Sequence, residues 1–217
     1  MTEQQQQQQQ QQPADQQQQD ADSLIPVLAM LLSAYLGHRA VTNRGELTRE
    51  QLLAPLGIEA TAAYALEQLA LRVLAWQRRS HGRAGDELIP FTAQGVQAGV
   101  RAGVEVIGDS IVDFDKDPAA LHDRPRVLAA MARGVARTTG NAAQEAIAQA
   151  AGWGHKVWMT QQDGRVRSTH RPMQGQRVPL GQKFTAGDGR SIDYPGDPTT
   201  NADLWVNCRC WMITERQ

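Results

Sequence analysis

The spacing of hydrophobic residues divides this chain into a helical part and a part of short strands and turns. Between residues 60 and 79, Leu66, Leu69, Val73 and Trp76 recur at intervals of three and four, as on one face of a helix. We therefore predict a helix there, with Trp76 in the core. After Pro125 a similar series predicts a last long helix that runs to Ala151: Leu128, Met131, Val135, Ala142 and Ala146.

Two further helices are predicted near the beginning of the chain. Ser23 is a good N-cap for the apolar run Leu24 to Leu36, which is about thirteen residues long, whereas a bilayer span needs roughly twenty. No basic region precedes this run and no clear cleavage site follows it, so we expect neither a membrane span nor a secretory signal. Thr48 and Gln51 have the spacing of a capping box and predict a short helix that ends at Pro55 and Gly57.

Glycine recurs every fourth residue between Ile89 and Asp109, at positions 95, 99 and 103. Each Gly costs a helix about 1 kcal/mol relative to Ala, so close packing against another helix must compensate. We expect such a contact within the chain or between copies. The acidic stretch Asp113 to Asp123 contains Pro118 and is predicted to be a loop or linker. It lacks the Gly and Glu that a calcium-binding loop requires.

Met1 to Asp22 is dominated by glutamine and has almost nothing apolar to bury, so we predict a disordered tail. The remaining helices define a helical region from residue 23 to 152. With 217 residues the chain has room for one such region and one small module.

The last third of the chain, residues 153–217, has the composition of a small β-rich module. Lys156 to Thr160 and Leu204 to Ile213 are β-branched and aromatic runs, and each predicts a strand. The basic segment Arg165 to Pro172 between them is long enough for two helical turns, and a Gly- and Pro-rich loop follows it. Alternation along the second strand places Cys208 and Cys210 on one face. The predicted fold class is therefore α+β.

Charge is unevenly distributed between the two parts. Residues 1–152 contain 13 Lys and Arg against 17 Asp and Glu, whereas residues 153–217 contain 9 against 6. The C-terminal module is therefore where a polyanion would bind, although a solvated basic face explains the same excess.

The order of residues in this module resembles the phage Mu F-like head morphogenesis (minor head) proteins. The similarity runs over about sixty residues, from a strand followed by D-G-R-V-R-x-x-H through Y-P-G-D-P to N-C-R-C before a last apolar strand. The residues that carry it are Trp158, Thr160, Asp163, Arg165, Val166, Arg167, His170, Gly175, Val178, Pro179, Tyr194, Pro195, Gly196, Asp197, Pro198, Asn207, Cys208, Arg209 and Cys210. The segment Val135 to Gly152 is similar to the helix that precedes this region in the family, but Thr139 stands where that helix usually has an acidic residue.

The resemblance implies a minor capsid protein of a tailed bacteriophage. Such a protein is present in few copies at the portal vertex and acts in head assembly and in DNA packaging or ejection. Its partners would be the portal protein, capsid or scaffolding components and packaged double-stranded DNA. It would be made in the bacterial cytoplasm and reside in the virion, inside the capsid near the portal.

The chemistry of the module centres on His170, Cys208 and Cys210, which have the donor atoms of a zinc site. His155 or Asp163 is the candidate fourth ligand. The alternative is a structural His170 beside two buried, inert thiols, and we predict this arrangement, without a cofactor. A disulfide between the two Cys is disfavoured by strand geometry and by the absence of an export signal. The residues expected to organise the module are Asp163, Arg165, Arg167, His170, Asn207, Cys208, Arg209 and Cys210.

Two other functions compete with a head protein. His170 with Asp163 and the neighbouring arginines would suit a metal-dependent nuclease or toxin-like effector carried in the virion, and the arginines alone would suit a DNA-binding module. His170 with Cys208 or Cys210 could also form a base and a nucleophile, but neither Cys follows an activating Gly-rich turn. A nuclease would need a metal cage, for which few carboxylates are available. We therefore predict no catalytic residues.

Overall fold

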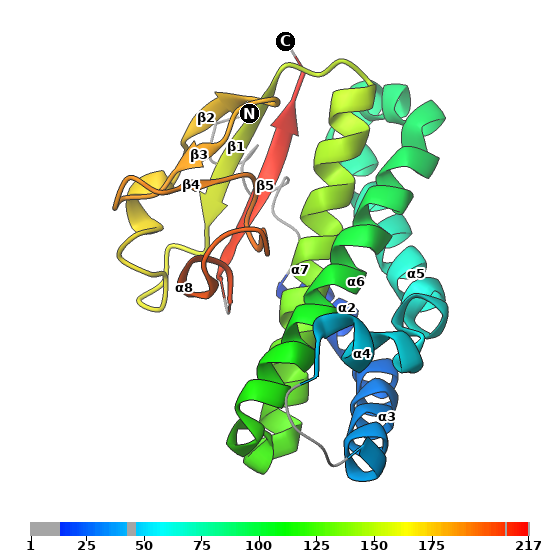
Figure 1. Ribbon diagram of the computed structural model, residues 1–217. Helices are drawn as coiled ribbons and strands as arrows, with labels where there is room; N and C mark the ends of the chain where they lie inside the picture. The colour runs from blue at the N-terminus through cyan, green and yellow to red at the C-terminus, as the bar shows by residue number, and fades with distance from the viewer. Residues whose placement is uncertain (1–13, 43–46, 207, 217) are drawn as a thin grey trace.

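A computed structural model describes residues 14–42, 47–206 and 208–216, in which a helical layer lies beside a small module of strands (Figure 1). The predicted α+β fold class is confirmed. The α-helices of the layer are α2 (Ala14–Asp22), α3 (Ile25–Thr42), α4 (Arg49–Leu53), α5 (Ile58–Ser80), α6 (Thr92–Lys116) and α7 (Arg124–Ala150). The 3₁₀ segments η1 (Ala54–Leu56), η2 (Gly82–Phe91) and η3 (Pro118–Asp123) connect them.

The C-terminal module contains two small antiparallel sheets. Strand β1 (His155–Thr160) is central in the first, with β2 (Arg177–Pro179) on one side and β5 (Cys210–Glu215) on the other. Strands β3 (Phe184–Thr185) and β4 (Ser191–Ile192) form the second sheet. Two short helical turns, η4 (Arg171–Met173) and α8 (Ala202–Trp205), complete the module.

Helix α7 is the helix of the layer that faces the module, with α6 on one side of it and β5 on the other (Figure 1). A Cβ atom at Gly99 would lie 2.8 Å from the carbonyl oxygen of Thr139 and 3.1 Å from the Cβ of Ala143. Gly95 and Gly103 meet α7 and α5 in the same way. The close helix contact predicted from the glycine spacing is therefore confirmed, and it forms within the chain. It also leaves little room for a larger side chain at position 139, which is fully buried.

The predicted short helix is confirmed as α4, with both hydrogen bonds of the capping box between Thr48 and Gln51. Helix α5 confirms the predicted helix as well, and Leu66, Leu69 and Val73 are buried in the core. The prediction for Trp76 is wrong. This side chain is half-buried and borders a cavity, because α5 faces the module there rather than another helix.

The prediction of disorder is wrong for Ala14–Asp22, which form α2. Ala21 is buried in the helical core, and Asp20 accepts a hydrogen bond of 2.8 Å from the Arg72 guanidinium. These two contacts anchor a segment that has few apolar residues. The rest of the predicted tail, Met1 to Pro13, lies outside the described residues.

The helix predicted for the apolar run near the N-terminus is longer than the run itself, because α3 continues to Thr42. By length and composition alone, Gln18–Thr42 is a helix capable of crossing a membrane, so the length argument against a span is wrong. One face of α3 packs into the helical core through Leu28, Leu31, Leu32 and Tyr35.

Three other segments differ from their predictions. Helix α6 extends through Lys116 into the expected acidic loop, where Asp115 accepts from Tyr35 and pairs with Arg39. Arg165 to His170 form turns rather than a helix, and only η4 follows. The strand expected from Leu204 begins only at Cys210, which lies opposite Thr160, the last residue of β1.

Candidate functional site

His170, Cys208 and Cys210 meet in the interior of the C-terminal module. The Nδ1 atom of His170 lies 3.5 Å from Cys208 Sγ and 3.6 Å from Cys210 Sγ. The three residues are only 1%, 1% and 3% exposed. Cys210 begins β5, Cys208 follows the α8 turn, and His170 ends the turn before η4. Both cysteines are free thiols.

The surroundings of this centre are apolar and aromatic. The Trp158 ring meets the His170 ring edge to face, with a centroid distance of 5.3 Å, and meets Phe184 similarly at 5.2 Å. Met173, Ile192, Leu204 and Met212 complete the cluster. Among the described residues, nothing accepts or donates a hydrogen bond at His170 Nε2, whereas Nδ1 faces both sulfurs.

An ion pair between Asp163 and Arg209 connects the turn after β1 to the segment before β5. Arg209 donates through Nε and Nη2 to one oxygen of Asp163, and the other oxygen accepts from the backbone N–H of Arg165. The hydrogen bonds from Arg209 lower the pKa of Asp163 below its ordinary value. Because Asp163 is occupied by Arg209, it does not join the centre. His155 lies at the opposite end of β1 and does not join it either.

The other arginines of the motif bind backbone carbonyls. The Arg167 guanidinium donates to the carbonyls of Leu204 and Val206, which fixes the chain next to Cys208. Arg171 donates to the carbonyl of Val166 at 3.0 Å and to that of Gly164 at 3.4 Å. The Arg165 side chain is exposed. Asn207 lies outside the described residues.

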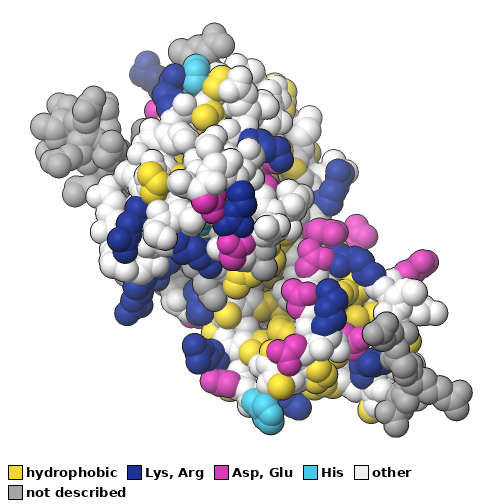
Figure 2. Space-filling view, turned by 60° about the vertical axis from the view of Figure 1, so that its left-hand side comes forward, with side chains coloured by type: hydrophobic (Ala, Val, Ile, Leu, Met, Phe, Trp, Pro, Cys, Tyr) yellow, Lys and Arg dark blue, Asp and Glu magenta, His cyan; other side chains and the backbone are white. Residues whose placement is uncertain are grey.

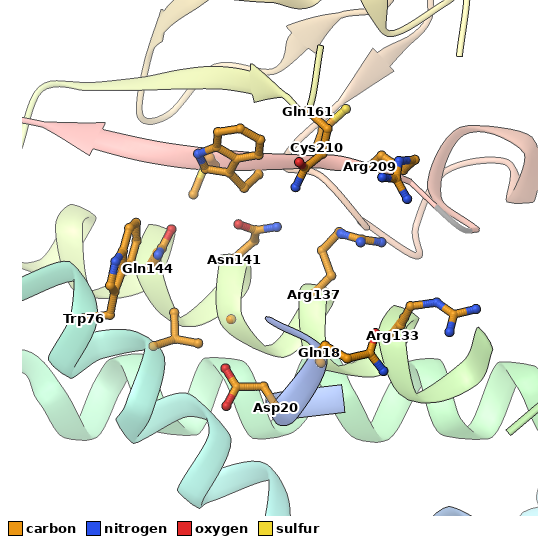
Figure 3. Close-up of a pocket in the computed structure, with 15 residues that line it drawn as sticks. Gln18, Asp20, Trp76, Arg133, Arg137, Asn141, Gln144, Gln161, Arg209 and Cys210 are labelled. Carbon is orange, nitrogen blue, oxygen red and sulfur yellow. The ribbon is translucent and has the colours of Figure 1, made fainter. Parts of the chain in front are cut away.

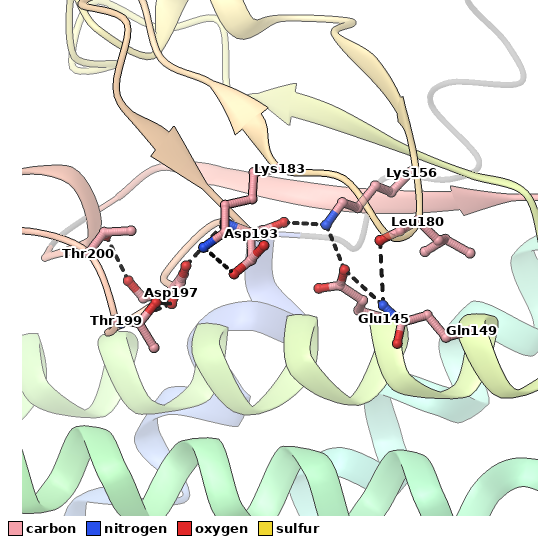
Figure 4. A network of polar contacts seen from close by, with 9 residues as sticks. All are labelled: Glu145, Gln149, Lys156, Leu180, Lys183, Asp193, Asp197, Thr199 and Thr200. Carbon is pink, nitrogen blue, oxygen red and sulfur yellow. Dashed lines mark hydrogen bonds and ion pairs between the residues drawn. The ribbon is translucent and has the colours of Figure 1, made fainter.

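The segment Tyr194 to Pro198 attaches the module to α7. Asn141 donates to the Pro195 carbonyl at 2.7 Å, and the Thr138 hydroxyl donates to the Gly196 carbonyl. Gly196 has a φ of 88°, which favours glycine. Buried Asp197 accepts from the backbone N–H groups of Asp193 and Thr199 and so holds this turn in shape (Figure 4).

A buried ion pair beside this turn was not predicted from the sequence. Lys156 is 0% exposed, and its ammonium donates to Glu145 at 2.6 Å and to the Asp193 carbonyl at 2.7 Å (Figure 4). Burial raises the pKa of Glu145, although Lys156 opposes the shift. Alternation along β1 puts Lys156 on the same face as Trp158, and this was the available signal in the sequence.

A cavity of about 270 Å³ lies between the helical layer and β5 (Figure 3). Arg133, Arg137 and Arg209 gather at one end and Trp76 lies at the other. Cys210 also lines this cavity, so the buried centre and the cavity share a wall. The Nη1 atom of Arg137 is buried and makes no hydrogen bond to any residue that the structure describes.

The two thiols and Arg137 influence one another. Burial lowers the pKa of the Arg137 guanidinium, and the nearby Cys208 and Cys210 oppose this shift. Burial would raise the pKa of Cys208, but Cys210, His170 and Arg137 outweigh it and bring the pKa well below the ordinary thiol value. The pKa of Cys210 is raised, because its thiol binds Cys208 and is buried.

Comparison of the chain with models of known protein families, with curated proteins and with solved structures finds no match.

Proposed function

We propose that this protein is a minor capsid protein of a tailed bacteriophage, present in few copies at the portal vertex and active in head assembly and in DNA packaging or ejection. The observation that carries the proposal is the ordered series of residues from Trp158 to Cys210. In this order and spacing they resemble the C-terminal region of the phage Mu F-like head morphogenesis proteins.

The contacts of these residues support a shared structural module. Arg209 pairs with Asp163 across 46 positions of sequence, and His170 meets both cysteines across 38 and 40 positions. The Pro195 and Gly196 carbonyls bind α7. Because the motif residues hold one another or hold the module to α7, their joint presence is expected of a common fold rather than of chance composition.

The geometry gives less support to a nuclease or toxin-like effector. A nuclease centre must touch a phosphodiester, whereas His170 and Cys208 are each 1% exposed and enclosed by aromatic side chains. Asp163, the carboxylate that such a centre would use, is paired with Arg209.

A DNA-binding module is also less well supported, because most of the basic side chains in the module already pair with carboxylates. Six of its nine Lys and Arg residues do so: Lys156, Arg177, Lys183, Arg190, Arg209 and Arg216. On the face drawn in Figure 2, basic and acidic side chains are interspersed rather than gathered into one positive field. Such a surface suits contact with protein better than with a polyanion.

Binding to the portal protein tests this function. We expect the purified chain to co-migrate with portal rings encoded by the same phage genome, and not with an unrelated ring protein of similar size. Binding to double-stranded DNA should be weak, with a shallow dependence on salt. Tight DNA binding with a steep salt dependence and no binding to portal rings would favour the DNA-binding alternative instead.

A further inference from the structure

We propose that His170, Cys208 and Cys210 bind a zinc ion, whose fourth coordination position is supplied from the arginine-lined cavity. This proposal stands on geometry and donor chemistry alone and does not depend on the function proposed above. It replaces the sequence-based prediction of two inert thiols.

The two nitrogen–sulfur distances agree with a tetrahedral zinc site. With zinc bonds of about 2.0 Å to nitrogen and about 2.3 Å to sulfur, a nitrogen and a sulfur at two corners of a tetrahedron lie about 3.5 Å apart. The structure has 3.5 Å and 3.6 Å from His170 Nδ1 to the two sulfurs. All three ligand atoms lie within 4.8 Å of one another.

Hydrogen bonding explains this arrangement less well. A ring nitrogen either donates one hydrogen or accepts along one lone pair, so Nδ1 makes one good hydrogen bond and not two. It nevertheless faces both sulfurs at almost equal distance. A single ion placed between the three atoms satisfies the nitrogen and both sulfurs together.

The donor set selects the class of metal. Two thiolates and one imidazole are soft or intermediate ligands, which bind zinc and not magnesium or calcium, since those ions require oxygen ligands. The centre is enclosed by Trp158, Phe184 and Met212. Zinc is also the ion that most often fills tetrahedral sites of this composition.

The fourth coordination position of the zinc ion faces the cavity in this proposal. Cys210 belongs both to the centre and to the cavity wall. Arg137 lines the same cavity, and its buried Nη1 atom has no hydrogen-bond partner within the described part of the chain. Two thiolates, one neutral imidazole and Zn²⁺ sum to zero charge, so the centre accepts a water molecule or an anion as its fourth ligand. Arg137 lines the cavity together with Cys210 and is the residue that would hold an anion there.

Metal content and a cobalt spectrum test the proposal on the intact chain. Untagged protein, purified without added chelator, is expected to contain about one zinc per chain by elemental analysis. Replacement of zinc by cobalt should give a thiolate-to-cobalt charge-transfer band together with the intense visible bands of tetrahedral cobalt. Protein that fails to retain zinc after addition of one equivalent and dialysis, or a cobalt complex without thiolate bands, would overturn the proposal.

Three variants distinguish the ligands from their surroundings. Cys208→Ser should lose the bound zinc, whereas His155→Gln, which alters a histidine outside the centre, should retain it. Arg137→Gln should keep the zinc but abolish the change that added phosphate or azide causes in the cobalt spectrum. Full zinc retention by Cys208→Ser contradicts the proposed ligands. If that variant does not fold, the wild-type cobalt spectrum still decides the question.

Discussion

The Lys156 side chain extends from β1 toward α7 and is fully buried. Its ammonium group pairs with Glu145 and donates to the Asp193 carbonyl. Placing two charges in the interior costs several kcal/mol in lost hydration, which their attraction only partly offsets. The pair therefore contributes little net stability, yet removal of one partner leaves the other charge buried alone. The change in stability on mutating the Lys156–Glu145 pair therefore depends on whether one residue or both are replaced.

We expect Lys156→Met to destabilise the protein by about 3 to 5 kcal/mol, because Glu145 would lose its buried partner. The double variant Lys156→Met with Glu145→Gln should regain a large part of this loss. Urea unfolding of the single and double variants measures both values. Arg177→Met, which removes an exposed ion pair with Glu215, is the matched control and should change stability by about 1 kcal/mol or less. Equal losses in the Lys156 and Arg177 variants would contradict this account.

The types of residue in the candidate centre could be predicted from the sequence, but their partners could not. His, Cys and Arg stand out in a short module, and their order carries the family resemblance. The Asp163–Arg209 pair, by contrast, forms because two distant turns meet. Cys208 and Cys210 do lie together at His170, but Cys208 reaches that point through a turn after α8 and not along a strand.

Helices α6 and α7 pack closely because glycines of α6 face the backbone and small side chains of α7. Long helices such as α5 and α7 were predictable, since their apolar faces recur over several turns. The short helix α4 was predictable too, from its capping box. The segment before Cys210 was not, because its β-branched and aromatic residues favour a strand, whereas Ala202–Trp205 form α8 and β5 begins only at Cys210.

Gly99→Ala is expected to destabilise the protein although Ala is the better helix former, because the new Cβ would lie 2.8 Å from the Thr139 carbonyl oxygen. We expect a loss of about 1 to 3 kcal/mol, and a larger one for Gly99→Leu. Gly37→Ala in α3 is the control, since a Cβ added there would meet no atom of another described element within 4 Å. It should stabilise by up to about 1 kcal/mol. Thermal unfolding of both variants measures the contrast, and a stabilised Gly99→Ala would refute the close contact.

The arrangement of the whole molecule depends on the contacts that join the helical layer to the C-terminal module. Gln77 of α5 donates to Thr214 of β5 at 2.6 Å, and His81 stacks edge to face on Trp153 with a centroid distance of 4.7 Å. Asn141 and Thr138 hold the Tyr194 to Pro198 segment from the other side. Protonation or loss of one of these groups should therefore affect the whole contact.

His81 makes this contact sensitive to pH. Burial lowers the pKa of His81 below the ordinary histidine value of about 6.5, and Glu215 opposes the shift only in part. The unfolded chain therefore binds a proton first, so stability present above about pH 6.5 is lost as the pH falls through the lower folded pKa. In His81→Gln the unfolding free energy should fall less between about pH 6.5 and 5 than in the wild type. His122→Gln, at an exposed position, should follow the wild type. Parallel curves for wild type and His81→Gln would disprove this.

The most direct test of the proposed function is the composition of phage particles. Tailed particles induced from a lysogen that carries this gene should be purified through a density gradient, treated with protease to remove attached proteins, and quantified by mass spectrometry. We expect the chain at a few copies per portal ring, far below the major capsid protein, and protected from protease until the capsids are opened. A chain found only in the soluble lysate, with the portal and capsid proteins detected in the particles, would contradict a role as a minor capsid protein.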